Sequence, residues 1–233
     1  KDQIVTKNVY LNENETVLEE IEVRGEKIDR KSNVNVGITK ITPREINILP
    51  SIGGEADLAQ YLQTLPGVVF TGDQGGQLYI RGGAPVQNLA LIDGMTVYSP
   101  FHSIGLFSVF DTDIMRSVDI FTGGFKADYG GRSSAVIDVK TRDGNKKEFA
   151  GKMSVNPFTA KLQIEGPLKK VTDSTAGISY IMSSRNSYLD QSSKVFYPYA
   201  NESGQLPFKF NDYYGKTTIQ APGGSKISLF GFN

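Results

Sequence analysis

The sequence predicts a small α+β domain, with short helices and a mixed β-sheet, followed by long antiparallel strands. Glycine accounts for 25 of the 233 residues and stretches with helical period are few, as expected for a turn-rich β protein. Two short helix patterns lie among several strand candidates between residues 21 and 147. From residue 148 onward, apolar and polar residues alternate along longer segments, which is typical of two-faced strands.

Residues 1–20 are expected to form an N-terminal tail. Val9 and Leu11 alternate with polar residues, which permits one short strand, and this strand would be the end of a preceding β-sandwich. The chain begins at Lys1 without a methionine or an apolar signal segment. We therefore interpret it as a mature or trimmed piece of a longer protein.

The helices of residues 21–147 are predicted from their end signals. After a short strand candidate at 21–23, Thr42 and Glu45 form a capping box with Pro43 at the first helical position. A second helix is predicted over about 55–64, and Pro-Gly ends it. Its apolar stripe at helical spacing comprises Leu58, Tyr61, Leu62 and Leu65.

Short strands are predicted around these helices. Asp93-Gly94 joins the segments 89–92 and 95–98, and this dipeptide favours the two positive φ angles of a type I′ hairpin turn. The segment 111–116 has the pattern of a helical turn. Further strands are predicted at 68–70, 77–81, 118–121 and 135–140.

Residues 148–233 alternate in a way that fits two kinds of sheet. The three predicted strands are 158–165, 176–183 and 213–220, and 187–211 is predicted to be a long polar loop. Such strands fit a membrane barrel with an apolar outer face, and they also fit a half-buried soluble sheet. The segment has room for four or five strands, too few to close a barrel of about 22 strands.

Composition excludes several functions. Lysine plus arginine equals aspartate plus glutamate at 25 each, so nothing indicates nucleic acid or an anionic lipid surface as a partner. Cysteine is absent, which excludes thiol catalysis and disulfides, and His102 is the single histidine. The sequence contains no run of 18 apolar residues, so no membrane-spanning helix is predicted. A secreted β-rich enzyme is the least favoured class, because no catalytic motif occurs and nothing selects a carboxylate pair.

Six short motifs follow one another between Leu58 and Gly144. They are Leu65-Pro66-Gly67-Val68, Ile80-Arg81-Gly82-Gly83, Leu91-Ile92-Asp93-Gly94, the segment 114–120 followed by Gly123-Gly124, Tyr129-Gly130-Gly131-Arg132, and Thr141-Arg142-Asp143-Gly144. In this order they resemble the plug domain of TonB-dependent outer-membrane receptors. The resemblance implies a plug domain over 21–147 and favours the barrel interpretation of 148–233.

The resemblance also implies a function. A plug of this family occludes the barrel, senses ligand and gates energised uptake. The expected partners are a TonB-type energising protein, outer-membrane lipid and an unidentified small molecule or metal chelate, with no cofactor. The location would be the outer membrane of a Gram-negative bacterium, with the plug accessible from the periplasm. The alternative is a plug-like protein that seals a larger pore made by another chain, such as a protein-export channel.

Arginines and an N-terminal segment are the first candidate site residues. Arg81, Arg132 and Arg142 are candidates for a latch that pairs the plug with barrel carboxylates; the alternative is a solvent-facing arginine beside a turn. The energising partner would grasp an extended segment by adding it to a sheet edge, and otherwise this segment is the first plug strand. The segment comprises Leu18, Glu19, Glu20, Ile21, Glu22 and Val23.

Aromatic and glycine residues complete the candidates. The resemblance implies that the loop with Tyr98, Phe101, His102 and Phe107 faces ligand; the alternative is a small hydrophobic core beneath it, with His102 a hydrogen-bonded loop residue. No phosphate-binding glycine motif and no complete calcium loop is present. We expect the turn residues to permit positive φ or close backbone approach. These residues are Gly82, Gly83, Asp93, Gly94, Gly123, Gly124, Gly130 and Gly131.

Overall fold

The computed structural model describes residues 37–50, 55–71, 77–102, 107–172, 175–196 and 209–233. Every described residue belongs to one compact unit, which spans residues 35–233. The predicted tail, the strand at 21–23 and the partner segment at 18–23 lie outside the described residues. No described helix has the length and apolar character that a membrane span requires.

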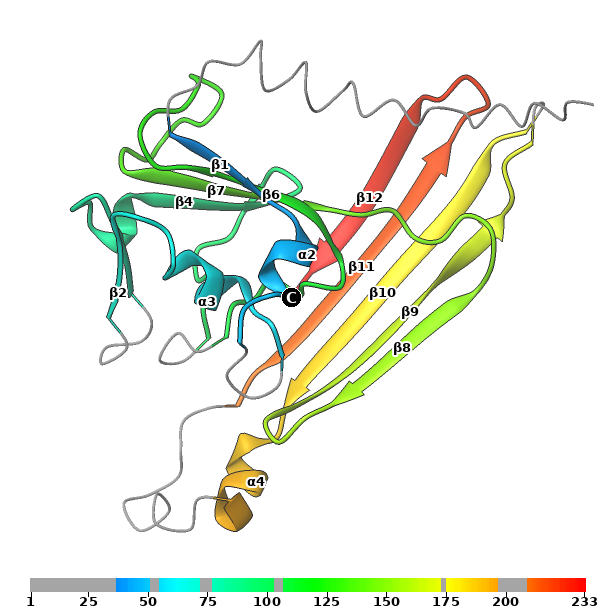
Figure 1. Ribbon diagram of the computed structural model, residues 1–233. Helices are drawn as coiled ribbons and strands as arrows, with labels where there is room; N and C mark the ends of the chain where they lie inside the picture. The colour runs from blue at the N-terminus through cyan, green and yellow to red at the C-terminus, as the bar shows by residue number, and fades with distance from the viewer. Residues whose placement is uncertain (1–36, 51–54, 72–76, 103–106, 173–174, 197–208) are drawn as a thin grey trace, which may run out of the picture. The chain divides into compact units, whose positions relative to one another are not determined.

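The first part of this unit is an α+β domain built on a mixed sheet (Figure 1). Its five strands have the order β1-β6-β7-β4-β5, with β4 and β7 parallel and the other neighbours antiparallel. A separate hairpin pairs β2 with β3. The elements are β1 (Ile38–Ile41), α2 (Pro43–Ile46), α3 (Leu58–Leu62), β2 (Val68–Thr71), β3 (Gln77–Ile80), the 3₁₀ turn η3 (Pro85–Gln87), β4 (Asn88–Ile92), β5 (Met95–Thr96), β6 (Met115–Phe121) and β7 (Ala135–Thr141).

One face of this sheet packs against α2 and α3, as Figure 1 shows. Alternate residues of β6 and β7, such as Val118 and Ile137, point into this core and meet Leu58 and Leu62 of α3. Full burial of each aliphatic side chain stabilises the fold by about 1.5–3 kcal/mol. The domain therefore has a hydrophobic core of its own.

Local sequence signals placed the turns well. Asp93 and Gly94 have φ of 46° and 86°, and β4 pairs with β5 around them, so the predicted hairpin is confirmed. Glu45 reaches back to the Thr42 backbone N–H at 2.7 Å. The Thr42 hydroxyl, however, donates to the Glu45 carboxylate instead of accepting from a backbone amide.

Three local predictions differ from the structure. The second helix is shorter than 55–64, because Asp57 caps it by accepting from Ala59 N at 2.8 Å and the chain before it is extended. The turn predicted at 111–116 is present over 112–114, with Ile114 N donating to the Asp111 carbonyl at 3.3 Å, but it is shorter than predicted because β6 already begins at Met115. The predicted loop at 187–211 contains a helix, α4 (Leu189–Phe196).

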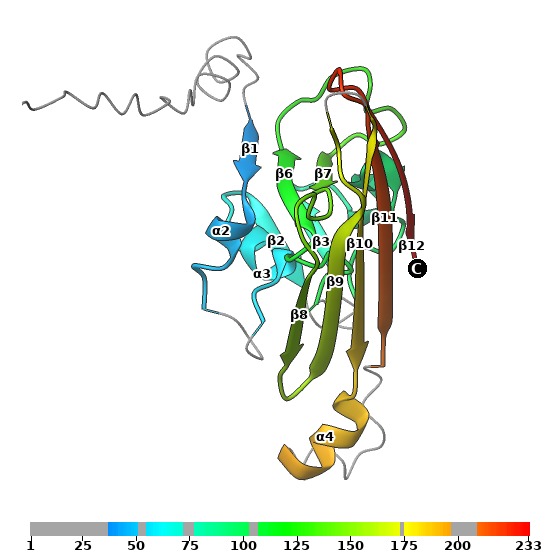
Figure 2. The ribbon, with the colours of Figure 1, turned by 90° about the vertical axis from the view of Figure 1, so that its right-hand side faces the viewer.

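The second part is a five-stranded antiparallel sheet with the order β12-β11-β10-β9-β8 (Figure 2). Both ribbon views place α4 at the end of the sheet opposite the β9–β10 turn. The sequence alternation did not predict β8. The strands are β8 (Ala150–Val155), β9 (Thr159–Lys169), β10 (Gly177–Ser187), β11 (Asn211–Gln220) and β12 (Lys226–Phe232).

The alternation of this sheet is inverted relative to a soluble sheet. On the outer face, Leu162 and Leu229 are 53% and 78% exposed, whereas the alternate polar residues Lys161, Gln163 and Thr218 are buried on the inner face. A half-buried soluble sheet would bury the apolar set instead. An apolar outer face with a polar inner face is the pattern of a membrane barrel wall. The predicted fold class, an α+β domain followed by antiparallel barrel strands, is confirmed.

Candidate functional site

The α+β domain meets the inner face of the strands mainly through charged and hydrogen-bonding side chains. The contacts fall into three groups, which we name after a central residue: the Arg185 group, the Lys161 group and the Asp93 group. Each group joins residues that lie far apart in the sequence.

The Arg185 group is the most deeply buried. Arg185 of β10 is 1% exposed and its guanidinium donates to Asp212 of β11, with Nη2–Oδ2 at 2.7 Å and Nε–Oδ2 at 3.0 Å. It also reaches into the α+β domain, donating to the Ser108 carbonyl and lying 3.5 Å from Asp57. Asp57 in turn accepts from the Ser108 N–H at 2.9 Å. One arginine therefore binds two parts of the structure together.

The Lys161 group lies beside it. The ammonium of Lys161 on β9 is 2.8 Å from Glu55, 3.0 Å from Asp111 and 2.6 Å from Asp113. Ser183 of β10 donates to Asp111 at 2.6 Å. Three carboxylates of the α+β domain thus surround one buried cation of the strands.

The Asp93 group holds the tip of the β4–β5 hairpin against β11. The Asp93 carboxylate accepts from Thr141 N at 2.8 Å and from Lys216 at 3.2 Å. Tyr214 donates to the same carboxylate at 3.2 Å and lies 2.6 Å from the Thr141 hydroxyl. The residues that the hairpin turn presents are therefore hydrogen-bonded to the wall.

The environment changes the pKa of the carboxyls in these groups. Burial raises the pKa of Asp57 above its usual value, and Arg185 and the N–H donors oppose this without cancelling it. Burial would also raise the pKa of Asp113 and Asp93. On Asp93, hydrogen bonds from Thr141 and the charge and hydrogen bond of Lys216 outweigh burial and lower the pKa. On Asp113, the hydrogen bonds and charges of Lys152 and Lys161 do the same.

The chain was compared with protein families, curated sequences and solved structures. Residues 30–137 match the family model of the TonB-dependent receptor plug domain. The chain contains a TonB-dependent receptor plug domain. The search of curated proteins found no match.

Solved receptors share the fold of the plug domain and the first strands. The chain is similar to the siderophore receptor PirA from Pseudomonas aeruginosa, with 19% identity and a TM-score of 0.51 over 84% of this chain and 36% of that one. It is also similar to the FrpB iron transporter from Neisseria meningitidis, with 15% identity and a TM-score of 0.53 over 84% and 31%. The chain therefore spans about a third of the length of the receptors it matches.

Of the three arginines predicted as latch residues, Arg142 alone pairs with a strand carboxylate. Its guanidinium makes two parallel hydrogen bonds to Glu165 of β9, at 2.6 and 2.8 Å. Arg81 is exposed on the turn after β3 with φ of 49°, and Arg132 lies in the bend before β7. Neither makes an ion pair within the described part of the chain, so nothing there supports their predicted latch role.

The predicted ligand-facing loop divides into two parts. Phe107 is buried against Phe158 and Phe210, and His102 pairs with Asp212 at 2.7 Å. This favours the alternative, a small apolar core beneath the loop with a hydrogen-bonded histidine. Tyr98 is exposed. Whether the loop contacts ligand stays a prediction.

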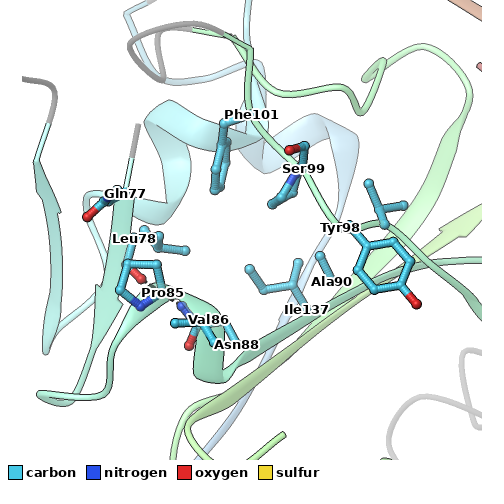
Figure 3. A pocket seen from close by; sticks show the side chains of 12 residues that line it. Gln77, Leu78, Pro85, Val86, Asn88, Ala90, Tyr98, Ser99, Phe101 and Ile137 are labelled. Carbon is cyan, nitrogen blue, oxygen red and sulfur yellow. Dashed lines mark hydrogen bonds between the residues drawn. The ribbon is translucent and has the colours of Figure 1, made fainter. Parts of the chain in front are cut away.

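Tyr98 and Phe101 line a pocket of about 230 Å³ on the plug domain. Figure 3 shows Leu78, Ala90 and Phe101 around the opening, with Tyr98 at its edge and its hydroxyl directed away. The lining is mainly apolar, and Asn88 at its floor donates to the Leu78 carbonyl at 2.6 Å. The Asn88 Oδ1 atom is buried without a hydrogen-bond partner among the described residues, so the pocket combines an apolar lining with one unpaired acceptor.

The predicted turn residues differ in what they require. Gly82, Gly94 and Gly131 have positive φ, and a Cβ at Gly83 would collide with the Ser134 side chain. Gly124 and Gly130 have φ outside the left-handed region and open space around them. The expectation of positive φ or close approach therefore holds at Gly82, Gly83, Gly94 and Gly131 and fails at Gly124 and Gly130.

The sequence did not identify the residues that dominate the interface. The segment Asp111-Thr112-Asp113 begins like a calcium loop but lacks its other ligands and its glycine, and both carboxylates pair with Lys161 in the structure. One signal was present: Lys161, Arg185 and Lys216 all occupy the polar phase of their strands. Long cationic side chains on the inner face of a barrel wall need carboxylate partners when they are buried.

Proposed function

We propose that this chain carries the plug of a TonB-dependent outer-membrane transporter, which occludes the barrel, senses ligand and gates energised uptake. The location would be the outer membrane of a Gram-negative bacterium, with the plug reachable from the periplasm. The family assignment supports a transport role, and we propose no enzymatic activity.

The observation that carries the proposal is the polar interface between the plug domain and the inner face of the strands. Charged groups that pair with one another when the plug is seated can be hydrated when it leaves. Buried ion pairs contribute little net stability compared with an apolar contact of the same size. Such an interface suits a part that must be held in place and also moved. In this proposal Arg142 acts as one latch.

The partners follow from the same proposal. A TonB-type protein would pull on the predicted segment Leu18–Val23. The ligand would be a small molecule or metal chelate, and ferric siderophores are the first to try, because similar solved structures include siderophore receptors. The alternative function, a plug for a pore made by another chain, is less favoured, because the plug domain contacts strands of its own chain.

Channel recordings in planar bilayers test this function. The full-length protein is expected to be closed, and a variant that lacks residues 37–141 is expected to conduct. A second variant carries Asp111→Cys and Ser183→Cys, whose native side chains lie 2.6 Å apart, joined by a cleavable thiol cross-linker. In cells, the cross-link should block uptake of ferric siderophores, and cleavage should restore it. The two single-cysteine variants are the controls.

Each outcome separates the candidate functions. An open channel in the intact protein would contradict occlusion. Conductance of the deletion variant only when a second, larger protein co-purifies would favour the alternative of a pore made by another chain. Unchanged uptake with the cross-link in place would contradict gating by movement of the plug away from the strands.

A further inference from the structure

Aromatic side chains cover the Arg185 group. The ring of Phe210, just before β11, stacks on His102 of the plug domain with ring centroids 3.9 Å apart and planes 8° apart. The guanidinium carbon of Arg185 lies 5.3 Å from the centroid of the same ring. Phe210 therefore contacts two partners of the Asp212 carboxylate, the Arg185 guanidinium and the His102 ring.

Two further rings extend this cover. Phe107 of the plug domain lies 5.7 Å from Phe210 and 6.2 Å from Phe158, which precedes β9. We call His102, Phe107, Phe158 and Phe210 the aromatic cover. Two of its members belong to the plug domain and two to the strand region, so it can close only while the plug is seated.

The ion pair beside the aromatic cover is much more deeply buried than the Lys226–Asp143 pair. Arg185 and Asp57 are each 1% exposed. By contrast, the side chain of Lys226, which pairs with Asp143 at 2.9 Å, is 41% exposed. The chemistry of the two pairs is similar, yet Coulomb attraction is much stronger and salt screening much weaker where water is excluded.

We propose that the aromatic cover regulates how firmly the plug is held, by keeping water and salt away from the Arg185 group. Opening the cover from the side of residues 98–102 and 107 would hydrate the ion pairs and loosen the plug without breaking its core. This inference rests on the proposed function, because it describes how the closed state is maintained. It names a control point that is separate from the ion pairs themselves.

Salt dependence of plug release tests the inference. The chain contains no cysteine, so Gln163→Cys places a single thiol on the inner face of β9, where the parent side chain is buried. The alkylation rate of this thiol in the detergent-solubilised full-length protein reports how often the plug leaves the strands. The rate is compared between about 0.01 and about 1 M salt, over which the Debye length falls from about 30 to about 3 Å.

Variants of Phe210 give the expected pattern. With the cover intact, the rate should change less than about twofold, because buried pairs are weakly screened. Phe210→Ala should make it rise at least about fivefold with salt, because the ion pairs then behave as surface pairs. Phe210→Leu keeps an apolar cover and should respond as the parent does. If Phe210→Ala does not fold, Phe158→Ala replaces it, with a response between the two.

The matched control is Phe121→Ala. Phe121 is a buried ring on the other face of the plug sheet, where it contacts Tyr129 at 5.0 Å. Its loss should raise the rate through lost packing while the salt response stays that of the parent. A salt response of Phe210→Ala equal to that of the parent, or of Phe210→Leu equal to that of Phe210→Ala, would overturn the inference. The assay uses no ligand or energy source, so failure of the transport function is seen separately, in the bilayer and uptake measurements.

Discussion

Removing the Arg185 charge should weaken the attachment of the plug domain to the strands more than removing any exposed charge does. In Arg185→Met, the side chain keeps much of its length and loses its donors. Asp57 then keeps only donors of its own domain, Asp212 retains His102, and the Ser108 carbonyl loses its partner from β10. The variant therefore leaves buried acceptors that were previously paired across the interface.

The magnitude follows from these remaining partners. Breaking a buried ion pair by removing one partner costs about 3–5 kcal/mol. Because Asp57 and Asp212 each keep some donors, we expect the lower end, about 3 kcal/mol, which corresponds to roughly a hundredfold more frequent release of the plug. Asp57→Asn added to Arg185→Met should recover part of this loss, since it removes the uncompensated carboxylate.

The Gln163→Cys reporter measures the effect as an alkylation rate. Lys226→Met serves as the matched control, because it removes a cation that pairs with Asp143 at the partly exposed end of the interface. Surface pairs contribute about 0–1 kcal/mol, so the control rate should rise at most about fivefold.

Two results would refute the reasoning. The first is a rate for Arg185→Met within a few fold of the Lys226→Met control, which would mean that Arg185 does not hold the plug. The second is a further increase on adding Asp57→Asn, which would mean that the unpaired carboxylate is not the source of the loss.

Two further predictions concern pH and the energising partner. Lys216→Met removes one cause of the lowered pKa of Asp93, whose contribution to attachment is present above its ordinary pKa of about 4 and lost as pH falls through its lowered value. The acid midpoint of thiol exposure should therefore shift to higher pH in this variant; Asp57, whose pKa is raised, contributes with the opposite sign in both proteins and cancels in the comparison. An unshifted midpoint would contradict the assigned role of Lys216. Deletion of Leu18–Val23 should abolish energy-dependent thiol exposure in cells and leave the channel closed in bilayers, whereas normal exposure would place the partner segment elsewhere.

The features that the sequence predicted well are local. The Asp93 hairpin depends on two adjacent residues, and the two faces of β9 to β11 depend on simple alternation. The interface depends on pairs that are distant in the chain: Lys161 and Asp111 are 50 residues apart, and Arg185 and Asp57 are 128 apart. No local propensity specifies such pairs.

The motifs did not predict which side of the interface carries the cations. The motifs emphasised arginines of the plug domain, and Arg142 does pair with Glu165. At the Lys161 and Arg185 groups the polarity is reversed, with cations on the strands and carboxylates on the plug. This follows from the strand alternation, which places Lys161, Arg185 and Lys216 on the inner face, combined with the need of buried cations for acceptors.

The composition of the hydrophobic core indicates how the plug domain can leave the strands. Among the buried residues of the main core, only Ile181 and Tyr214 come from the strand sheet, and all others come from the plug domain. Detachment would expose these two side chains, the rings of Phe158 and Phe210 in the aromatic cover, and the partly buried Phe230 and Phe232, at up to about 1.5–3 kcal/mol each for full exposure. Most of the remaining attachment lies in ion pairs and hydrogen bonds. A force applied at the N-terminal side would thus act against these polar contacts and a small set of mainly aromatic contacts, while the plug sheet and its helices keep their own core.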